Sequence, residues 1–344
     1  MIRRALELLL LLVVVGVFAG REVLRLWETP LNINAQGYRL TVAPGDTLAA
    51  VSRLLHEDGV LAHPRLLMLY GRFTGLDASI KQGEYLLPQF STAASVLDLL
   101  QSGRVIFYQV TLPEGITLRQ ALEILWREPG LQRELSGPDA PALAQLVAPR
   151  EMTEGLFFPD SYQYTRGASD LSILRRAHRM MSDALEQEWQ GRAEGLPYGD
   201  AYEALIMASI VEKETGLAQE RGEIAGVFVR RLQRGMRLQT DPTVIYGIGP
   251  LFDGNLTRRH LADESNPYNT YRHRGLPPSP IALPGRAALH ASLHPAPGST
   301  LYFVARGDGG HVFSETLAEH QKAVRKYQLR RRKDYRSSPA AGDQ

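Results

Sequence analysis

The most informative stretch of this sequence is Ala208-Ser-Ile-Val-Glu212-Lys-Glu214-Thr215-Gly216. It lies at the end of a strongly helical run, residues 201–215. At about 100° per residue, Glu214 falls on the apolar face of such a helix, whereas Glu212 projects nearly opposite. A carboxyl group on an apolar stripe is desolvated, and in the last turn it also lies near the negative end of the helix dipole. Both effects favour its protonated form and raise its pKa. The stretch therefore indicates that Glu214 is a general acid. The alternative is that both glutamates are solvated helix residues.

The composition excludes several classes of protein. The chain has 344 residues, of which 44% are hydrophobic and 22% charged, so it is globular and long enough for about two domains. The net charge is only +2, which indicates no nucleic-acid partner. Because cysteine is absent, disulfides, thiolate metal sites and a cysteine nucleophile are excluded. We expect no metal and no cofactor.

The N-terminus predicts export from the cytoplasm. Arg3 and Arg4 precede a run without charge, residues 8–19, and Arg21 closes its far side. We interpret residues 1–20 as a single-pass transmembrane anchor with its arginines in the cytoplasm, although the run is slightly short of the ~20 residues that span a bilayer. The alternative is a signal peptide cleaved after Ala19. Residues 21–37 are expected to be a linker.

A repeated sequence pattern follows the linker. The segment 38–55 predicts a strand, a Pro-Gly turn and a helix capped by Thr47. The segment 108–125 repeats this pattern with Thr117 as the cap, and a looser copy runs over 83–100 through Ser91-Thr92. We therefore expect small α+β modules, the first of them over residues 38–107.

Residues 108–329 form the second predicted domain. The pattern is mostly helical over 118–189, with a loop at 154–160, and a further helix is expected over 223–234. A strand at 301–305, a short hairpin to 311–313 and a helix over 314–328 should complete it. The predicted fold class is α+β, with a mainly helical second domain that carries a small β element. The basic tail, 330–344, is expected to be disordered.

Loops rich in sugar-contacting side chains follow the glutamates. Tyrosine rings stack on sugar faces, and amides bond to hydroxyl and N-acetyl groups. Prolines within these loops hold such side chains in place. The candidate substrate-binding residues are Gln239, Asp241, Tyr246, Tyr268, Asn269 and Tyr271. In the alternative interpretation these loops only make turns, with the tyrosines packing against them.

Two resemblances follow from these motifs. The segment from Val42 to Leu54 is similar to the first half of a LysM module, a family that binds N-acetylglucosamine-containing glycans. The whole chain resembles the YceG-like family of endolytic murein transglycosylases. The motifs that carry this likeness are Glu212-Lys-Glu214-Thr215, Arg237-Leu-Gln-Thr-Asp-Pro-Thr-Val-Ile-Tyr-Gly247, Tyr268-Asn-Thr-Tyr271, Gly275-Leu-Pro-Pro278 and Gly309-Gly-His-Val-Phe313.

The family resemblance implies a bacterial inner-membrane protein whose lysozyme-like catalytic domain faces the periplasm. It implies that Glu214 is the catalytic residue and that the substrate is a peptidoglycan glycan strand. The reaction would cleave the β-1,4 bond between N-acetylmuramic acid and N-acetylglucosamine and leave 1,6-anhydro ends, which would terminate strand growth. Partners would be the membrane and peptidoglycan synthases of the penicillin-binding class. Glu212 and Asp241 are assigned supporting roles.

Three other functions compete with this one. A metal hydrolase could use His290 and His294, which are spaced i, i+4. However, Ala291 stands where a zinc protease has its general base, and Pro295 disfavours continuation of the helix. A membrane-anchored scaffold could bind glycan through the LysM-like module without cleaving it. A hydrolytic muramidase would use water in place of the sugar's own hydroxyl.

Overall fold

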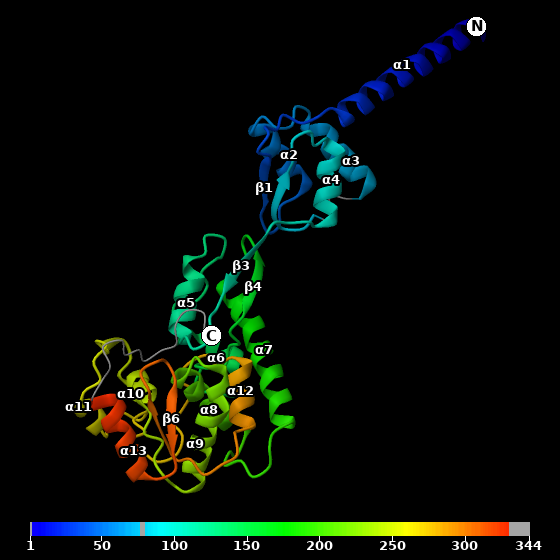
Figure 1. Cartoon of the computed structure of the whole chain (residues 1–344). Coiled ribbons are helices and arrows are strands. Elements are labelled where there is room, and N and C mark those ends of the chain that lie inside the picture. Colours follow the sequence, from blue (N-terminus) through cyan, green and yellow to red (C-terminus); the bar gives the residue numbers. More distant parts are fainter. Residues whose placement is uncertain (1, 76–79, 330–344) are drawn as a thin grey trace. The chain divides into compact units, whose positions relative to one another are not determined.

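The computed structural model describes residues 2–75 and 80–329, which divide into two compact units (Figure 1). Unit 1 contains the chain up to Tyr108 together with Gln163–Ala168. Unit 2 contains Gln109–Tyr162 and the chain from Ser169 onward. Helices alternate with three two-stranded sheets, so the α+β prediction is confirmed. The predicted tail, 330–344, lies outside the described residues.

The N-terminal helix α1 differs from the predicted anchor and linker. It runs over Ile2–Glu28, past residue 20, and the Glu22–Arg25 ion pair (3.0 Å) lies within its second half. Within residues 2–75 and 80–329, no helix is both long and apolar enough to cross a membrane. The reason is the charged residues on either side of the apolar run, at Glu7 and at Arg21 and Glu22. The uncharged part between them is about 20 Å long at ~1.5 Å per residue, whereas a bilayer core is ~30 Å thick.

Unit 1 is built on a strand–helix–helix–strand arrangement. Strand β1 (Tyr38–Val42) leads to α2 (Leu48–Glu57) and α3 (Pro64–Thr74), and β2 (Gly83–Leu87) returns antiparallel to β1. Tyr38 pairs with Leu87 and Val42 with Gly83. Helix α4 (Ala93–Ser102) follows β2. The sides of these elements that face one another form one apolar core, centred on Leu40, Val51, Leu55, Tyr85 and Val96.

The pattern that occurs three times in the sequence is confirmed as three strand-to-helix units. Strands β1, β2 and β3 (Phe107–Thr111) each precede a helix that starts after a threonine. Thr47, Thr92 and Thr117 are the N-caps of α2, α4 and α5 (Leu118–Arg127), and each hydroxyl accepts a backbone N–H three residues on. Because these bonds satisfy donors that have no partner within the helix, the caps fix where each helix begins.

Strand β4 (Ser161–Thr165) was missed by the sequence analysis, which placed it in a mostly helical region. It pairs with β3. The segment after it returns to unit 1, where Arg166 Nε lies 3.0 Å from Glu84, a carboxylate whose side chain is 5% exposed. Tyr162 and Tyr164 are buried on one face of the strand, with the period of two that strands require. The strand is short, and only its pairing with a partner distant in sequence reveals it.

Unit 2 is mainly helical, and its central element is α8 (Ala201–Glu214). Every residue from Ala204 to Val211 is buried, as in a helix enclosed on all sides. It packs against α7 (Asp170–Gln190), α9 (Arg221–Gln233), α10 (Asp241–Ile248) and α12 (Arg286–Leu293) (Figure 1). The remaining helices are α6 (Pro141–Val147), α11 (Arg258–Ala262) and α13 (Leu317–Val324).

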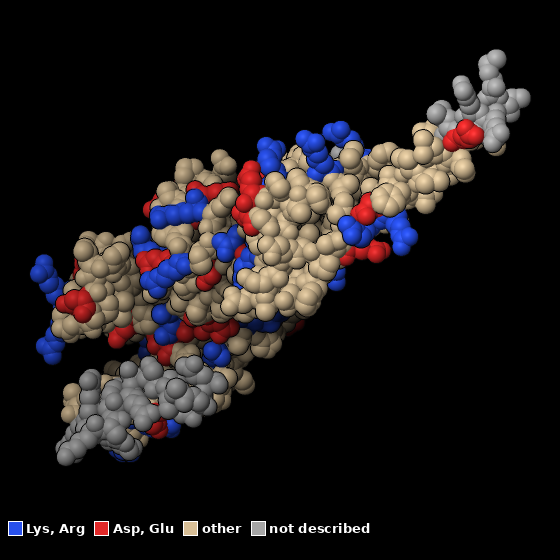
Figure 2. All heavy atoms as spheres, turned by 90° about the horizontal axis from the view of Figure 1, so that it is seen from above, with Lys and Arg blue, Asp and Glu red and all other residues tan. Residues whose placement is uncertain are grey.

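The small β element predicted at the end of unit 2 is present. Strand β5 (Tyr302–Ala305) pairs antiparallel with β6 (His311–Ser314). Helix α13 is shorter than predicted and is continued by a wider turn over Arg325–Leu329. On the face shown in Figure 2, Lys and Arg are interspersed with Asp and Glu, in keeping with a net charge of only +2.

Candidate functional site

Glu214, the last residue of α8, is the candidate general acid. Its side chain is partly buried, and the Thr240 hydroxyl donates a hydrogen bond to its Oε1. Burial raises the pKa of Glu214 to about 7; the Thr240 bond opposes this rise, the nearby Asp241 carboxylate adds to it, and Arg231 opposes it. A carboxyl with such a pKa is protonated in a large fraction of molecules at neutral pH and can also ionise there. Glu214 can therefore both give and take a proton.

The backbone around Gln239 places the Thr240 hydroxyl. Gln239 has a φ of 53°, in the left-handed region that a non-glycine residue rarely adopts. Its N–H donates to the carbonyl of Thr270 (3.2 Å), and the N–H of Thr240 donates to the Thr270 hydroxyl (3.0 Å). These bonds hold the strained turn in place. The side chain of Gln239 itself is exposed.

Two more of the predicted residues lie beside Glu214. Asp241 begins α10 and accepts a hydrogen bond from the Tyr271 hydroxyl, O to O 2.6 Å. Burial and the charge of Asp241 raise the pKa of Tyr271 well above its usual range, so this phenol remains a donor. Asp241 is exposed. The structure thus brings Glu214, Asp241 and Tyr271 into one group, which we call the acid group.

A second group contains the other two predicted tyrosines. The rings of Tyr246, on α10, and Tyr268 meet edge to face with centroids 4.9 Å apart. The Tyr268 hydroxyl lies 2.8 Å from the Ser279 hydroxyl, and the Tyr246 hydroxyl donates to Glu154 Oε2 at 3.2 Å. We call Tyr246, Tyr268 and Glu154 the tyrosine group. Both groups draw on α10.

Glu154 is the residue of this region that the sequence analysis missed. It is 9% exposed, and its Oε1 accepts the N–H of Leu118 at 2.8 Å. Burial raises its pKa to about 7, although bonds from the backbone and from Tyr246 oppose the rise. The only sequence feature that could have identified Glu154 is its position as the single acidic residue at the start of the apolar loop 154–158. Nothing in that pattern shows that the loop folds against Tyr246.

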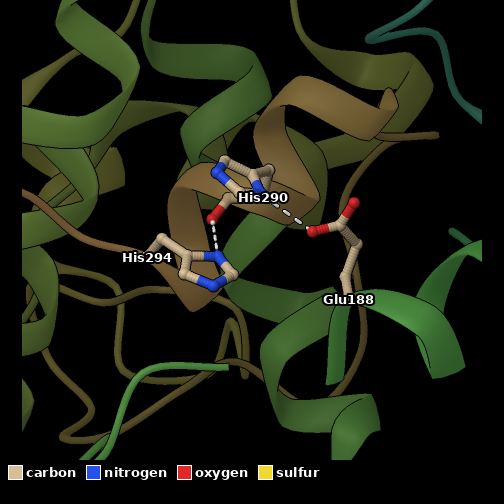
Figure 3. A group of neighbouring side chains, drawn as sticks. All are labelled: Glu188, His290 and His294. Atoms are coloured by element: carbon tan, nitrogen blue, oxygen red, sulfur yellow. Dashed lines mark hydrogen bonds and ion pairs between the residues drawn. The ribbon is translucent and has the colours of Figure 1, made fainter. Parts of the chain in front are cut away.

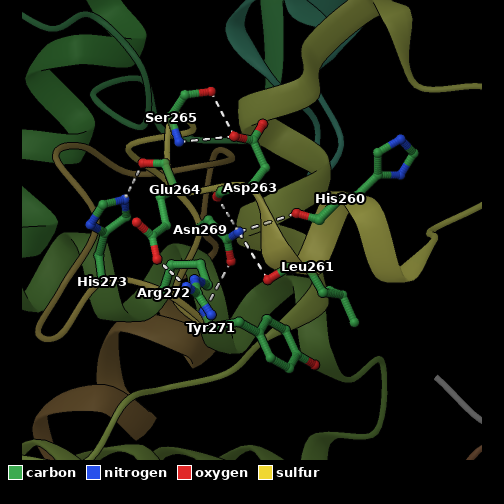
Figure 4. Close-up of polar contacts among 9 residues, drawn as sticks. All are labelled: His260, Leu261, Asp263, Glu264, Ser265, Asn269, Tyr271, Arg272 and His273. Carbon is green, nitrogen blue, oxygen red and sulfur yellow. Dashed lines mark hydrogen bonds and ion pairs between the residues drawn. The ribbon is translucent and has the colours of Figure 1, made fainter.

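Asn269 has a role inside its loop (Figure 4). It is fully buried, and its Nδ2 lies within bonding distance of the carbonyls of His260 (3.1 Å), Leu261 (3.3 Å) and Asp263 (2.7 Å). Its Oδ1 accepts the N–H of Tyr271 at 3.1 Å. Because both ends of the amide are engaged by the backbone, Asn269 fixes the loop that presents Tyr271.

Glu212 lies apart from Glu214, as the helical spacing predicts, but it is not solvated. Its side chain is 6% exposed, its Oε2 accepts the N–H of Gly285 at 2.9 Å, and its Oε1 lies 3.7 Å from Arg221. Burial raises its pKa. The alternative in which both glutamates are solvated is therefore wrong, because neighbouring segments enclose α8 on every side. Glu212 connects the end of α8 to the loop before α12.

The histidines considered for zinc are brought together by the fold (Figure 3). His290 and His294 stack with ring centroids 4.2 Å apart, and His290 Nδ1 lies 2.9 Å from Glu188 on α7. Among the described residues, this trio has the spacing to hold a metal ion. However, Glu188 is shared with Arg286 at 3.3 Å, and the ring nitrogens of His294 lie at the carbonyls of Gly191 (2.8 Å) and His290 (3.2 Å). An ion-pair and hydrogen-bond network therefore accounts for this cluster.

The structure thus combines an α+β fold with a carboxyl of raised pKa at the end of a buried helix. The YceG-like family model matches residues 40–326, and the chain belongs to this family. An endolytic murein transglycosylase of Bacillus subtilis is 29% identical over an alignment of 318 positions that covers 87% of this chain and 85% of that protein.

Two further relatives extend the comparison. An endolytic murein transglycosylase of Streptococcus pneumoniae serotype 2 is 26% identical, over 86% of this chain but only 59% of its own length. A crystal structure of a YceG-like protein from Listeria monocytogenes is 26% identical and superposes with a TM-score of 0.52. It covers 84% of this chain and 99% of the Listeria chain.

The raised pKa values predict a pH-dependent stability. Glu214 and Glu154 have pKa values of about 7 in the folded chain against an ordinary value of 4.5. Between these values the folded state binds more protons than the unfolded state, so the free energy of unfolding falls as the pH rises from 4.5 to about 7. Glu214→Gln and Glu154→Gln should each flatten this slope in urea unfolding followed across that range. Glu123→Gln, on the exposed side of α5, is the control and should keep the wild-type slope. An unchanged slope in both test variants would contradict the assignment.

Proposed function

We propose that this chain is an endolytic murein transglycosylase. It would cleave the β-1,4 bond between N-acetylmuramic acid and N-acetylglucosamine within peptidoglycan glycan strands. The observation that carries the proposal is Glu214, a carboxyl with a pKa of about 7 at the end of a buried helix. Two relatives that carry this name align over most of the chain and support the same activity. The region matched by the family model, residues 40–326, includes the acid group.

In the first step, Glu214 gives its proton to the glycosidic oxygen. The bond from the anomeric carbon of the muramic acid to that oxygen breaks, the departing sugar leaves as an alcohol, and Glu214 becomes a carboxylate. The Thr240 hydroxyl, which already donates to Oε1, stabilises the new charge. The N-acetyl group of the muramic acid can stabilise the positive charge that develops at the anomeric carbon.

In the second step, Glu214 takes the proton of the 6-hydroxyl of the same muramic acid. The oxygen of that hydroxyl bonds to the anomeric carbon and closes a 1,6-anhydro ring, which regenerates the acid. Since nucleophile and electrophile belong to one ring, the effective concentration is high and no second carboxylate has to activate water. This chemistry differs from that of ordinary glycosidases, which use two carboxylates.

The other predicted residues receive binding roles in the proposal. Asp241 and Tyr271 would hold the reacting sugar near Glu214, since Asp241 is exposed and Tyr271 partly so. The exposed side chain of Gln239 would contact the same sugar. Tyr246 and Tyr268 would bind a neighbouring ring. Glu212 supports the loop at Gly285 and takes no part in proton transfer.

The proposal also includes the location and the partners. Peptidoglycan lies outside the cytoplasm, so the catalytic unit would act there, beside peptidoglycan synthases of the penicillin-binding class. The apolar side chains of α1, among them Leu9, Leu12 and Phe18, are exposed and support attachment of this helix to the inner membrane. The strand–helix–helix–strand part of unit 1 would be a LysM-like module that binds glycan.

A prediction concerns the two glutamates of α8. Glu214→Gln removes the proton donor and should lower turnover on purified sacculi by about 10²–10⁴-fold. Glu212→Gln keeps an oxygen for the Gly285 N–H and should cost much less activity. Circular dichroism and glycan binding should show that both variants are folded. The reverse order of activities would place the acid at Glu212.

The product chemistry gives a second prediction. Digestion in ¹⁸O-water should yield glycan ends of 1,6-anhydro-N-acetylmuramic acid that carry no label, because the sugar's own hydroxyl is the nucleophile. Mass spectrometry of the soluble products measures this directly. Labelled reducing ends would show attack by water and a hydrolytic muramidase, whereas an absence of any products would favour a glycan-binding scaffold.

Membrane attachment can be tested by fractionation. The full chain should sediment with inner membranes and should resist extraction by high salt, since apolar contact is not screened. N-terminal sequencing of that fraction should recover the start of the chain. A mature form that begins near Gly20 would instead show cleavage of a signal peptide.

A further inference from the structure

Glu154 is a buried carboxyl that the proposed reaction does not use. It is held at two ends: Oε1 accepts the N–H of Leu118, the first residue of α5, and Oε2 accepts the hydroxyl of Tyr246. With 9% of the residue exposed, its carboxyl group is not placed to touch a polymer directly. Whatever it does for a ligand must therefore pass through Tyr246.

The backbone next to Glu154 is fixed by close packing. Gly155 has a φ of +80°, and a Cβ at this position would lie 2.3 Å from the Cβ of Pro280. Only glycine allows this approach without a shift of the chain. The loop that carries Glu154 is consequently pressed against the segment that carries Ser279, whose hydroxyl meets that of Tyr268. Both tyrosines are thus oriented by hydroxyl contacts to the same packed region.

Helix α10 connects these tyrosines to the acid group. Its first residue is Asp241, beside Glu214, and Tyr246 follows about 7.5 Å along the axis at ~1.5 Å per residue. The two residues therefore lie in successive turns of one rigid element, which fixes Tyr246 relative to the acid group.

We propose that Glu154 is a positioning residue that holds Tyr246 as an inward hydrogen-bond donor, so that Tyr246 and Tyr268 form a rigid platform for the sugar ring adjacent to the one cleaved. Because the Tyr246 hydroxyl also interacts with the side chain of Ser279, it is held from two sides. The ligand at this platform is a sugar that presents an apolar ring face to the two tyrosines. This inference rests on the proposed function, since it assumes a glycan strand as ligand.

The substitution Glu154→Gln tests the direction of the bond to Tyr246. The glutamine oxygen can still accept from Leu118, which places the amide NH₂, a donor, opposite the Tyr246 hydroxyl. We expect KM for glycan strands to rise about tenfold, the size typical of one lost hydrogen bond, with kcat within about twofold of wild type. Tyr246→Phe should give a similar rise, and the double variant should be no worse than either single one, because both remove the same interaction.

Asp170→Asn is the matched control. Asp170 is also a fully buried carboxylate in unit 2 that accepts a backbone N–H, that of Glu134 at 3.0 Å. The structure records no contact between it and the two tyrosines. The Asp170→Asn substitution should lower the melting temperature of the protein without raising its KM for glycan strands. A drop in kcat at constant KM for Glu154→Gln, or additive effects of Glu154→Gln and Tyr246→Phe, would overturn the positioning role.

Binding measured without catalysis separates this inference from the proposed reaction. In a Glu214→Gln background, calorimetry with purified glycan strands should show a Kd about tenfold higher when Glu154→Gln is added. Suppose that wild-type protein releases ¹⁸O-labelled reducing ends, but that Glu154→Gln still raises Kd about tenfold. The proposed reaction is then wrong, and the positioning role of Glu154 is supported. If anhydro products form and Kd is unchanged by Glu154→Gln, the platform fails and the reaction stands.

Discussion

The enclosure of α8 by four other helices is the constraint on which the rest of unit 2 depends. A helix whose residues 204–211 are all buried has no solvated side, so its final turn ends among other chain segments. A carboxyl placed there loses most of its hydration, and this loss accounts for the raised pKa of Glu214. The same burial would be costly for an unpaired charge. The Thr240 hydroxyl and the loop at Gly285 supply hydrogen bonds to the two glutamates at this end of the helix.

The acid group and the tyrosine group differ in their surroundings. Around Glu214 the partners are one hydroxyl, an exposed carboxylate and a partly buried phenol. Around Glu154 two donors from different elements converge on one buried carboxyl, an arrangement that favours fixed geometry. Helix α10 joins both, with its first turn at the acid group and Tyr246 in its second. In the proposed function, this rigid helix would hold a glycan strand in one register between the acid group and the tyrosine group.

Two loop residues, Asn269 and Gln239, shape the site through their contacts with the backbone. Asn269 bonds to the carbonyls of His260 and Leu261 in α11, to that of Asp263 just after it, and to the N–H of Tyr271. It thereby sets where that tyrosine lies (Figure 4). Gln239 adopts a strained backbone that is stabilised by Thr270 and that aims Thr240 at Glu214. An asparagine or glutamine in a polar loop is easily interpreted as a ligand contact, but burial and the use of each amide atom decide between contact and support.

The sequence by itself determined the local structure, because it depends on neighbours in the chain. The spacing of apolar residues predicted α8, α9 and β5, the threonines marked the starts of three helices, and the Glu-Lys-Glu-Thr motif pointed to Glu214. The pairing of β4 with β3, the contact of Glu154 with Tyr246 and the trio of Glu188, His290 and His294 join segments far apart in the chain. Local periodicity carries no information about such pairs. The burial of both Glu212 and Glu214 was likewise decided by the tertiary structure, since a helical wheel gives a direction for each side chain but not what lies in that direction.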